Sequence, residues 1–232
     1  LLREQGGELF GAMPLYLRTN SYGEFVFDWA WADAFERAGG KYYPKLVSAI
    51  PFTPATGNRV LVANEKDLDL AMPILTSGAV ELLEHNNASS LHCLFPNVTQ
   101  TEQLKAQDLL IRSGCQYHWY NRDYESFDDF LQALNSKRRK QIKRERRDAN
   151  ASGVEIEVLH DDAITPEHWK VFHEFYCSTF YRKWGEPRLT EAFFCYLSET
   201  LPKAPLLVLG KYEGEYIAGS FSMRGLDTLY GR

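Results

Sequence analysis

Residues 206–230, LLVLGKYEGEYIAGSFSMRGLDTLY, decide the fold of the second half of the chain. Runs of β-branched and aromatic residues are broken here by two turns, which contain Gly214 and Gly225. Such alternation of strand formers and turn residues is typical of a β-meander. The predicted strands are 206–211, 216–223 and 228–230.

The segments before this meander predict one strand and then two helices. The residues of 154–159 alternate as in a strand. Thr165 followed by Pro166 is typical of a helix start, with the threonine as N-cap and the proline at the first helical position. A second helix is predicted over 190–201. The second half therefore runs strand, helix, helix and three strands, and it is preceded by a further helix that begins after Ser126.

The first half also mixes strands and helices, so the predicted fold class is α/β (α+β). The expected strands or extended runs are 9–19, 24–28, 46–52, 90–95 and 115–121, and the expected helices are 29–38, 67–85 and 101–112. We expect two domains, 1–124 and 125–232.

The composition is that of a globular protein, with 232 residues, 44% of them hydrophobic and 25% charged. Apolar runs stay shorter than the roughly 20 residues that cross a bilayer, so we expect no membrane insertion and a cytoplasmic location. The four cysteines form no CxxC pair, which argues against a metal site and against a disulfide framework.

Positive charge is concentrated in 137–147, KRRKQIKRERR, where eight residues are basic and only Glu145 is acidic. This segment carries +7 within a chain of net charge −5, so the remainder carries −12. A solvated helix face is the ordinary interpretation. Eight charges in so short a segment cannot all be paired locally, and the concentration indicates a local anion site more than an extended nucleic-acid surface.

Five long stretches resemble the bacterial family of predicted N-acyltransferases described as Fem-like and related to peptidoglycan biosynthesis. They are SYGEFVFDWAWADAFERAGGKYYPKL (21–46), IPFTPATGNRVL (50–61), CQYHWYNRDYESFDDFLQALNSKRRKQIKRERR (115–147), FYRKWGEPRLTEAFF (180–194) and DTLYGR (227–232). The resemblance implies a GNAT-like acyl-CoA N-acyltransferase fold with tandem halves. Compared with that pattern, we expect both halves to be incomplete in this chain.

In GNAT-like proteins a glycine loop after the fourth strand turns its backbone N–H groups toward a pyrophosphate. The resemblance places this loop at 53–59, where Gly57 matches the first glycine of the pattern and Pro54 and Arg59 replace its end residues. A plain strand-to-helix turn is the alternative. The expected donor is acyl-CoA, such as acetyl-CoA, bound by Thr53, Pro54, Thr56, Gly57, Asn58 and Arg59.

Acyl transfer to an amine needs a base for the ammonium proton and an acid for the leaving group. His118, in CQYHWYN, is the first candidate base, although a lone strand histidine is more often bonded to a backbone carbonyl. Asp28 and Tyr43 are the other catalytic candidates. The expected substrate-binding residues are Lys45, Asn121, Arg138, Arg139, Arg144, Lys183 and Trp184.

Three functions remain open at this level. The first is an N-acyltransferase acting on an amine of a small metabolite or cell-wall precursor, and the second is a tRNA-dependent aminoacyltransferase of Fem type. The third is a module that recognises an anionic ligand without turnover. The acidity outside 137–147 favours a small anion over tRNA as the ligand of the basic segment.

Overall fold

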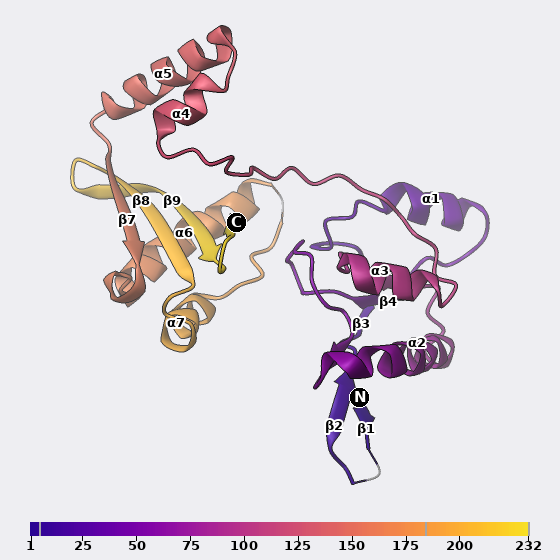
Figure 1. Cartoon of the computed structure of the whole chain (residues 1–232). Helices are drawn as coiled ribbons and strands as arrows, with labels where there is room; N and C mark the ends of the chain where they lie inside the picture. Colours follow the sequence, from indigo (N-terminus) through magenta and orange to yellow (C-terminus); the bar gives the residue numbers. More distant parts are fainter. Residues whose placement is uncertain (5, 184, 232) are drawn as a thin grey trace. The chain divides into compact units, whose positions relative to one another are not determined.

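The computed structural model describes residues 1–4, 6–183 and 185–231, and the chain forms two compact units, Leu1–Trp119 and Tyr120–Arg232 (Figure 1). The structure has the mixed α/β architecture that the sequence predicted, and its strands form three small sheets. Among the described residues, no helix is both long enough and apolar enough to cross a membrane.

The first unit contains two three-stranded sheets. One has the order β1-β2-β5, with strands Leu2–Arg3, Leu9–Ala12 and Leu61–Val62. The other has the order β3-β4-β6, with strands Tyr16–Arg18, Lys45–Ser48 and Leu91–Cys93. Within the second sheet β3 and β4 are antiparallel, whereas β4 and β6 are parallel. The loops that follow β4 and β6 therefore start at the same edge of the sheet.

Helix α2, Leu68–His85, connects β4 to β6 as the crossover that a parallel pair requires. Its Ala71, Met72 and Leu75 are buried in a core that also contains Val60 and Leu104. The remaining helices of this unit are α1 (Trp29–Arg37), the short 3₁₀ helix η1 (Glu65–Asp67) and α3 (Val98–Lys105).

The second unit is built on an antiparallel sheet of order β10-β9-β8-β7. Trp169, Phe172 and Phe194 pack against its Leu207 and Phe221, which makes an aromatic core between the helices and the sheet. The elements are α4 (Phe127–Gln132), α5 (Ser136–Asn150), β7 (Glu155–His160), η2 (Asp161–Ala163), α6 (Pro166–Arg182), α7 (Glu191–Thr200), β8 (Pro205–Tyr212), β9 (Glu215–Arg224) and β10 (Leu229–Gly231).

Most elements that the sequence predicted for the second unit are confirmed, but the single helix expected from Ser126 through the basic segment is two helices, α4 and α5, with Asn135 as the N-cap of the second. The meander is β8, β9 and β10, and the N-cap side chains of Ser126 and Thr165 accept backbone hydrogen bonds from Asp129 and His168. Figure 1 shows α4 and α5 as a helical hairpin that precedes β7. The predicted tandem relation between the two units stays a proposal.

Three predictions for the first unit were wrong. Residues 115–121 form no strand and are exposed, because the segment finds no neighbouring strand to supply its ladder hydrogen bonds. The helix expected over 101–112 is α3, which ends at Lys105. The run 24–28 is not extended either, since Phe25 and Phe27 have positive φ of 60° and 50°. Such backbone is strained for a bulky residue.

Candidate active site

A buried cluster surrounds Lys45, the first residue of β4. All four residues of this strand are buried, so the ammonium of Lys45 has no access to water. Its Nζ donates to Ser21 Oγ at 2.7 Å, to Glu24 Oε2 at 2.7 Å and to Asp28 Oδ2 at 2.6 Å. An ammonium has three N–H donors, and here each has a partner.

Two tyrosines complete this cluster. Tyr42 donates its hydroxyl hydrogen to Asp28 Oδ2 at 2.7 Å, and the hydroxyl of Tyr43 lies 2.9 Å from Ser21 Oγ. Lys45 Nζ also lies 5.4 Å and 5.8 Å from the ring centroids of Tyr42 and Tyr43, within cation–π range. We call Ser21, Glu24, Asp28, Tyr42, Tyr43 and Lys45 the Lys45 cluster. It brings together three residues that the sequence singled out: Asp28, Tyr43 and Lys45.

The electrostatics of the cluster fix the charge of Asp28. Burial alone raises the pKa of its carboxyl, but hydrogen bonds from Lys45, Ser21 and Tyr42 outweigh burial and lower the pKa to about 2. Burial and the neighbouring carboxylate raise the pKa of Tyr42 above its usual value. Asp28 is thus a fully enclosed carboxylate and a weak base at neutral pH. Its place in the cluster is that of a partner for Lys45.

His92 was not predicted as a site residue, yet it lies on the same face of the sheet as Lys45. It pairs in register with Val47 of β4, two residues beyond Lys45, and its ring packs edge-on against Tyr42. Burial, then the charge of Lys45, lowers the pKa of His92 to about 4. A histidine inside an apolar strand, LHC, was the available signal.

The loop 53–59 lies between β4 and β5, and internal hydrogen bonds use several of its backbone donors. Gly57 N donates to Phe95 O at 3.1 Å, and Arg59 N donates to Gln100 Oε1 at 2.7 Å. The buried guanidinium of Arg59 donates to the carbonyls of Ala55 and Phe95. These contacts hold the loop against the segment that follows β6. The other predicted donor-binding residues of the loop are Thr53, Pro54, Thr56 and Asn58.

His118 and Asn121 lie on an exposed irregular segment, where the first unit ends and the second begins. His118 Nε2 lies 3.1 Å from Gln116 Oε1, and Asn121 Oδ1 accepts a hydrogen bond from Tyr124 N at 2.9 Å. The backbone of this segment is irregular, so the predicted strand histidine is an exposed loop histidine.

The predicted basic residues of the second unit have different surroundings. Arg139 closes the end of α4, since its guanidinium donates to the carbonyls of Leu131, Gln132 and Leu134 at 2.9, 3.2 and 2.8 Å. Arg138 donates to Gln141, also on α5. Helix α5 has no buried residue. Its outward stripe, Lys137, Lys140 and Arg144, forms no hydrogen bond or ion pair with the residues that the structure describes.

Of the remaining predictions, Lys183 is the exposed C-cap residue of α6, whereas Trp184 lies outside the described residues. The described residues contain no group of three or more His, Cys, Asp or Glu side chains placed to hold a metal ion. All four cysteines are free thiols, and burial raises the pKa of Cys93 to about 11.

Comparison with known protein families identifies a family for this chain. The model of the FemAB-like family, described as peptidoglycan biosynthesis/recognition, matches residues 1–232. No curated protein sequence matches the chain. The family match covers all five stretches quoted above, and it confirms the resemblance to Fem-like proteins that those stretches indicated.

Proposed function

The chain belongs to the FemAB-like family, and we propose that it transfers an acyl group to an amine of a cell-wall precursor or a small metabolite. Members of this family are transferases related to peptidoglycan biosynthesis, and membership implies a GNAT-like fold. Beyond family membership, we propose a specific reaction, the residues that carry it out and the acyl donor.

The observation that carries the proposal is a hydrogen-bonded chain that runs from buried Asp28 through Lys45 and Ser21 to the hydroxyl of Tyr43. Tyr43 is only partly buried, unlike the other members of the chain, so its hydroxyl is the member suited to exchange a proton with a substrate. A positioned acid or base of this kind contributes about 10²- to 10⁴-fold in rate.

In the proposed reaction the neutral amine attacks the carbonyl carbon, the C–N bond forms and the bond to the leaving group breaks. Tyr43 donates its proton to the departing thiolate or alkoxide and regains one from water, since it is only partly buried, while Ser21 keeps its hydroxyl in position. His118 removes the ammonium proton, as proposed from the sequence, because histidine is the side chain that most often serves as a general base. Asp28 and Lys45 keep Ser21 and Tyr43, which we call the relay, in position through their hydrogen bonds.

Acyl-CoA is the proposed donor, with the loop 53–59 as its binding segment. The loop follows β4 at the carboxyl edge of the parallel β4–β6 pair, where ligands of open α/β sheets commonly bind. Since the N–H groups of Gly57 and Arg59 are used internally, Thr56 and Asn58 supply the contacts to the ligand in this proposal.

A tRNA-dependent aminoacyltransferase is the second candidate, and the outward stripe of α5 favours it. Lys137, Lys140 and Arg144 project from a helix without buried residues and lack carboxylate partners in the described part of the chain. Such cations suit a phosphate backbone. A third candidate is recognition of an anionic glycopeptide without turnover, which agrees with the word "recognition" in the family description.

The test is a transfer assay of the protein with a labelled acyl-CoA series and, separately, aminoacyl-tRNA, each with an amine-bearing peptidoglycan precursor as acceptor. We expect labelled amide product from acyl-CoA. Product from aminoacyl-tRNA alone, with binding that weakens steeply as salt rises, would establish the second candidate instead. Binding of the precursor without product from either donor would leave the recognition module.

A further inference from the structure

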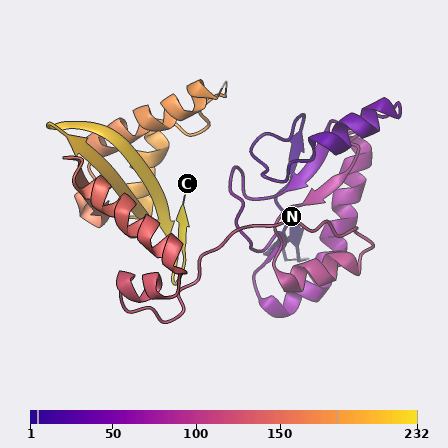
Figure 2. The same cartoon turned by 90° about the horizontal axis from the view of Figure 1, so that it is seen from above.

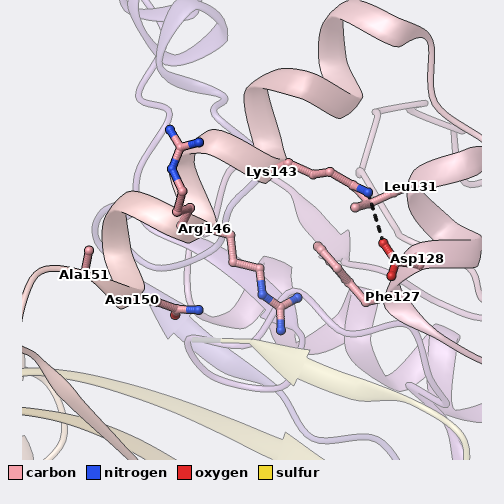
Figure 3. Close-up of a pocket in the computed structure, with 8 residues that line it drawn as sticks. Phe127, Asp128, Leu131, Lys143, Arg146, Asn150 and Ala151 are labelled. Atoms are coloured by element: carbon pink, nitrogen blue, oxygen red, sulfur yellow. Dashed lines mark ion pairs between the residues drawn. The ribbon is translucent and has the colours of Figure 1, made fainter.

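A groove between α4 and α5 of the second unit is the further candidate for a ligand site (Figure 3). It has a volume of about 690 Å³, within the range of roughly 300–1,000 Å³ that small-molecule sites occupy. The groove is broad and open to water. It is lined by Phe127, Asp128, Leu131, Lys143, Arg146, Arg147, Asn150 and Ala151.

The packing of the two helices holds this groove in shape. Leu131 is buried between them, and Arg139 ties the start of α5 to the end of α4 through three hydrogen bonds to carbonyl oxygens. Across the groove, Lys143 Nζ forms an ion pair with Asp128 Oδ1 at 3.3 Å, which Figure 3 shows as a dashed line. Lys143 is therefore already paired with a carboxylate.

Arg146 differs from Lys143 in having no carboxylate partner. Its guanidinium carbon lies 4.2 Å from the ring centroid of Phe127, so the guanidinium packs against that ring in a cation–π contact. No hydrogen bond or ion pair to Arg146 is found among residues 1–4, 6–183 and 185–231. Its N–H donors, in a planar fork that matches phosphate, are thus held beside an open groove and left unused.

Two neighbours add to this arrangement. Arg147 also lines the groove, and within the described part of the chain its ion pair is with the adjacent, largely exposed Asp148 at 3.3 Å, an interaction of little strength in water. Asn150 contributes an amide to the same lining. With Lys143, Arg146 and Arg147 against Asp128, the lining carries an excess of positive charge. We propose that the α4–α5 groove binds a diphosphate group, with Arg146 as its principal contact.

The competing interpretation is that Arg146 and Arg147 only complement the dipole of α5, since both lie near its C-terminal end. That interpretation accounts for their charge. It does not account for the position of the Arg146 guanidinium over an aromatic ring from a different helix, facing a groove. An open, charged groove also suits a diphosphate, because such a ligand keeps part of its surface in water.

The diphosphate has two chemical sources, an acyl donor such as CoA and a nucleotide-linked precursor. All residues of this site belong to the second unit. The test measures ligand binding and needs no turnover, so its result does not depend on whether the proposed transferase reaction occurs. The experiment is calorimetric titration of the protein with inorganic pyrophosphate, UDP and CoA at low salt. Stronger binding of UDP assigns the precursor, stronger binding of CoA assigns the donor, and equal binding shows recognition of the diphosphate alone.

Two variants make the test specific. Arg146→Gln should weaken pyrophosphate binding roughly ten- to a hundredfold, the effect of a charge-assisted hydrogen-bonded pair. Phe127→Leu should weaken it roughly two- to fivefold by releasing the guanidinium. Arg182→Gln is the matched control, since Arg182 is an exposed arginine of the same unit, on α6, and lies outside the lining. The proposal is overturned if the unaltered protein binds none of the three probes saturably, or if Arg182→Gln weakens binding as much as Arg146→Gln.

Discussion

The ammonium of Lys45 lies 2.6 Å from the carboxylate of Asp28, and neither side chain is exposed to solvent. Asp28 occupies the N-cap position of α1, where an aspartate usually accepts hydrogen bonds from the helix N–H groups. Here its side chain forms no capping bond and is turned to Lys45 instead. This pair ties the start of α1 to the start of β4. Glu24 adds a second carboxylate, so Lys45 neutralises part of a buried negative charge.

Replacing Lys45 by Met should therefore be strongly destabilising, because it leaves the buried carboxylate of Asp28 without its cation and leaves Glu24 with Arg18, 3.7 Å away, as its ion-pair partner. Breaking a buried ion pair from one side costs about 3–5 kcal/mol, and we expect the free energy of unfolding in urea to fall by that amount. Lys41→Met is the matched control, since Lys41 is exposed close by in the sequence. Equal stability of the two variants would show that the cluster contributes nothing to the fold.

His92 should make the protein sensitive to mild acid. Its pKa is about 4 when folded against 6.5 for the free side chain, so between these values the unfolded chain binds a proton that the folded chain does not. The stability contributed above pH 6.5 is thus lost as the pH falls from 6.5 to 4, by roughly 3 kcal/mol in all.

Urea unfolding at pH 7, 5.5 and 4.5 measures this loss, and His92→Gln should flatten the curve in that window. His85→Gln, at the exposed end of α2, is the control and should keep the slope. A slope that is unchanged in His92→Gln would assign the acid sensitivity to other groups. Asp28 does not interfere, because its stabilisation is lost only as the pH falls from 3.8 toward 2.

Local sequence patterns were enough to predict the helix caps and turns of this protein. The caps at Ser126 and Thr165 and the turns of the β8–β10 meander were predictable because each depends on residues a few positions apart. The Lys45 cluster was only partly predictable. Asp28, Tyr43 and Lys45 were singled out separately, but their contact depends on how β4 packs against the 21–28 segment. A lysine that leads an apolar run, KLVSAI, was the one signal of burial.

For residues 115–121 the local pattern predicted a strand that the structure does not have. The sequence CQYHWYN is rich in strand formers, yet a strand also requires a neighbour to pair with, and that information is absent from the pattern. The anion site predicted on Arg138, Arg139 and Arg144 stays a prediction. In the structure Arg138 donates to Gln141, Arg139 donates to carbonyls at the end of α4 and Arg144 is exposed, and these surroundings depend on how α5 packs on α4.

Arg139→Ala should lower the stability of the protein, and any effect on ligand binding should follow from that loss of stability. The substitution removes three hydrogen bonds to carbonyls at and just beyond the end of α4, those of Leu131, Gln132 and Leu134, which are then left without this partner. We expect a loss of roughly 1–3 kcal/mol in the free energy of unfolding. Arg144→Ala is the control, since Arg144 is exposed on the same helix, and surface substitutions usually stay within about 0.5 kcal/mol. A stable Arg139→Ala protein would show that the capping contacts are dispensable.

His118→Ala tests the proposed base without disturbing the fold. Because His118 is exposed on an irregular segment, thermal unfolding should be unchanged while kcat falls about 10²- to 10⁴-fold and donor affinity stays nearly constant. Full turnover by His118→Ala between pH 6 and 9 would remove His118 from the mechanism.

Tyr43→Phe is the sharpest test of the proposed relay, because it deletes one oxygen and keeps the ring beside Lys45. If Tyr43 protonates the leaving group, kcat should fall about 10²-fold or more while KM for the donor stays nearly constant. Ser21→Ala should lower kcat as well by interrupting the chain between Lys45 and Tyr43, with some loss of stability because Lys45 then lacks one acceptor. Tyr16→Phe, on the partly exposed β3, is the matched control and should leave kcat unchanged.

A donor whose leaving group needs no proton, such as an acyl ester of a low-pKa phenol, should restore turnover to Tyr43→Phe. Failure of that rescue in a folded variant would mean that Tyr43 contributes packing to the Lys45 cluster and no proton.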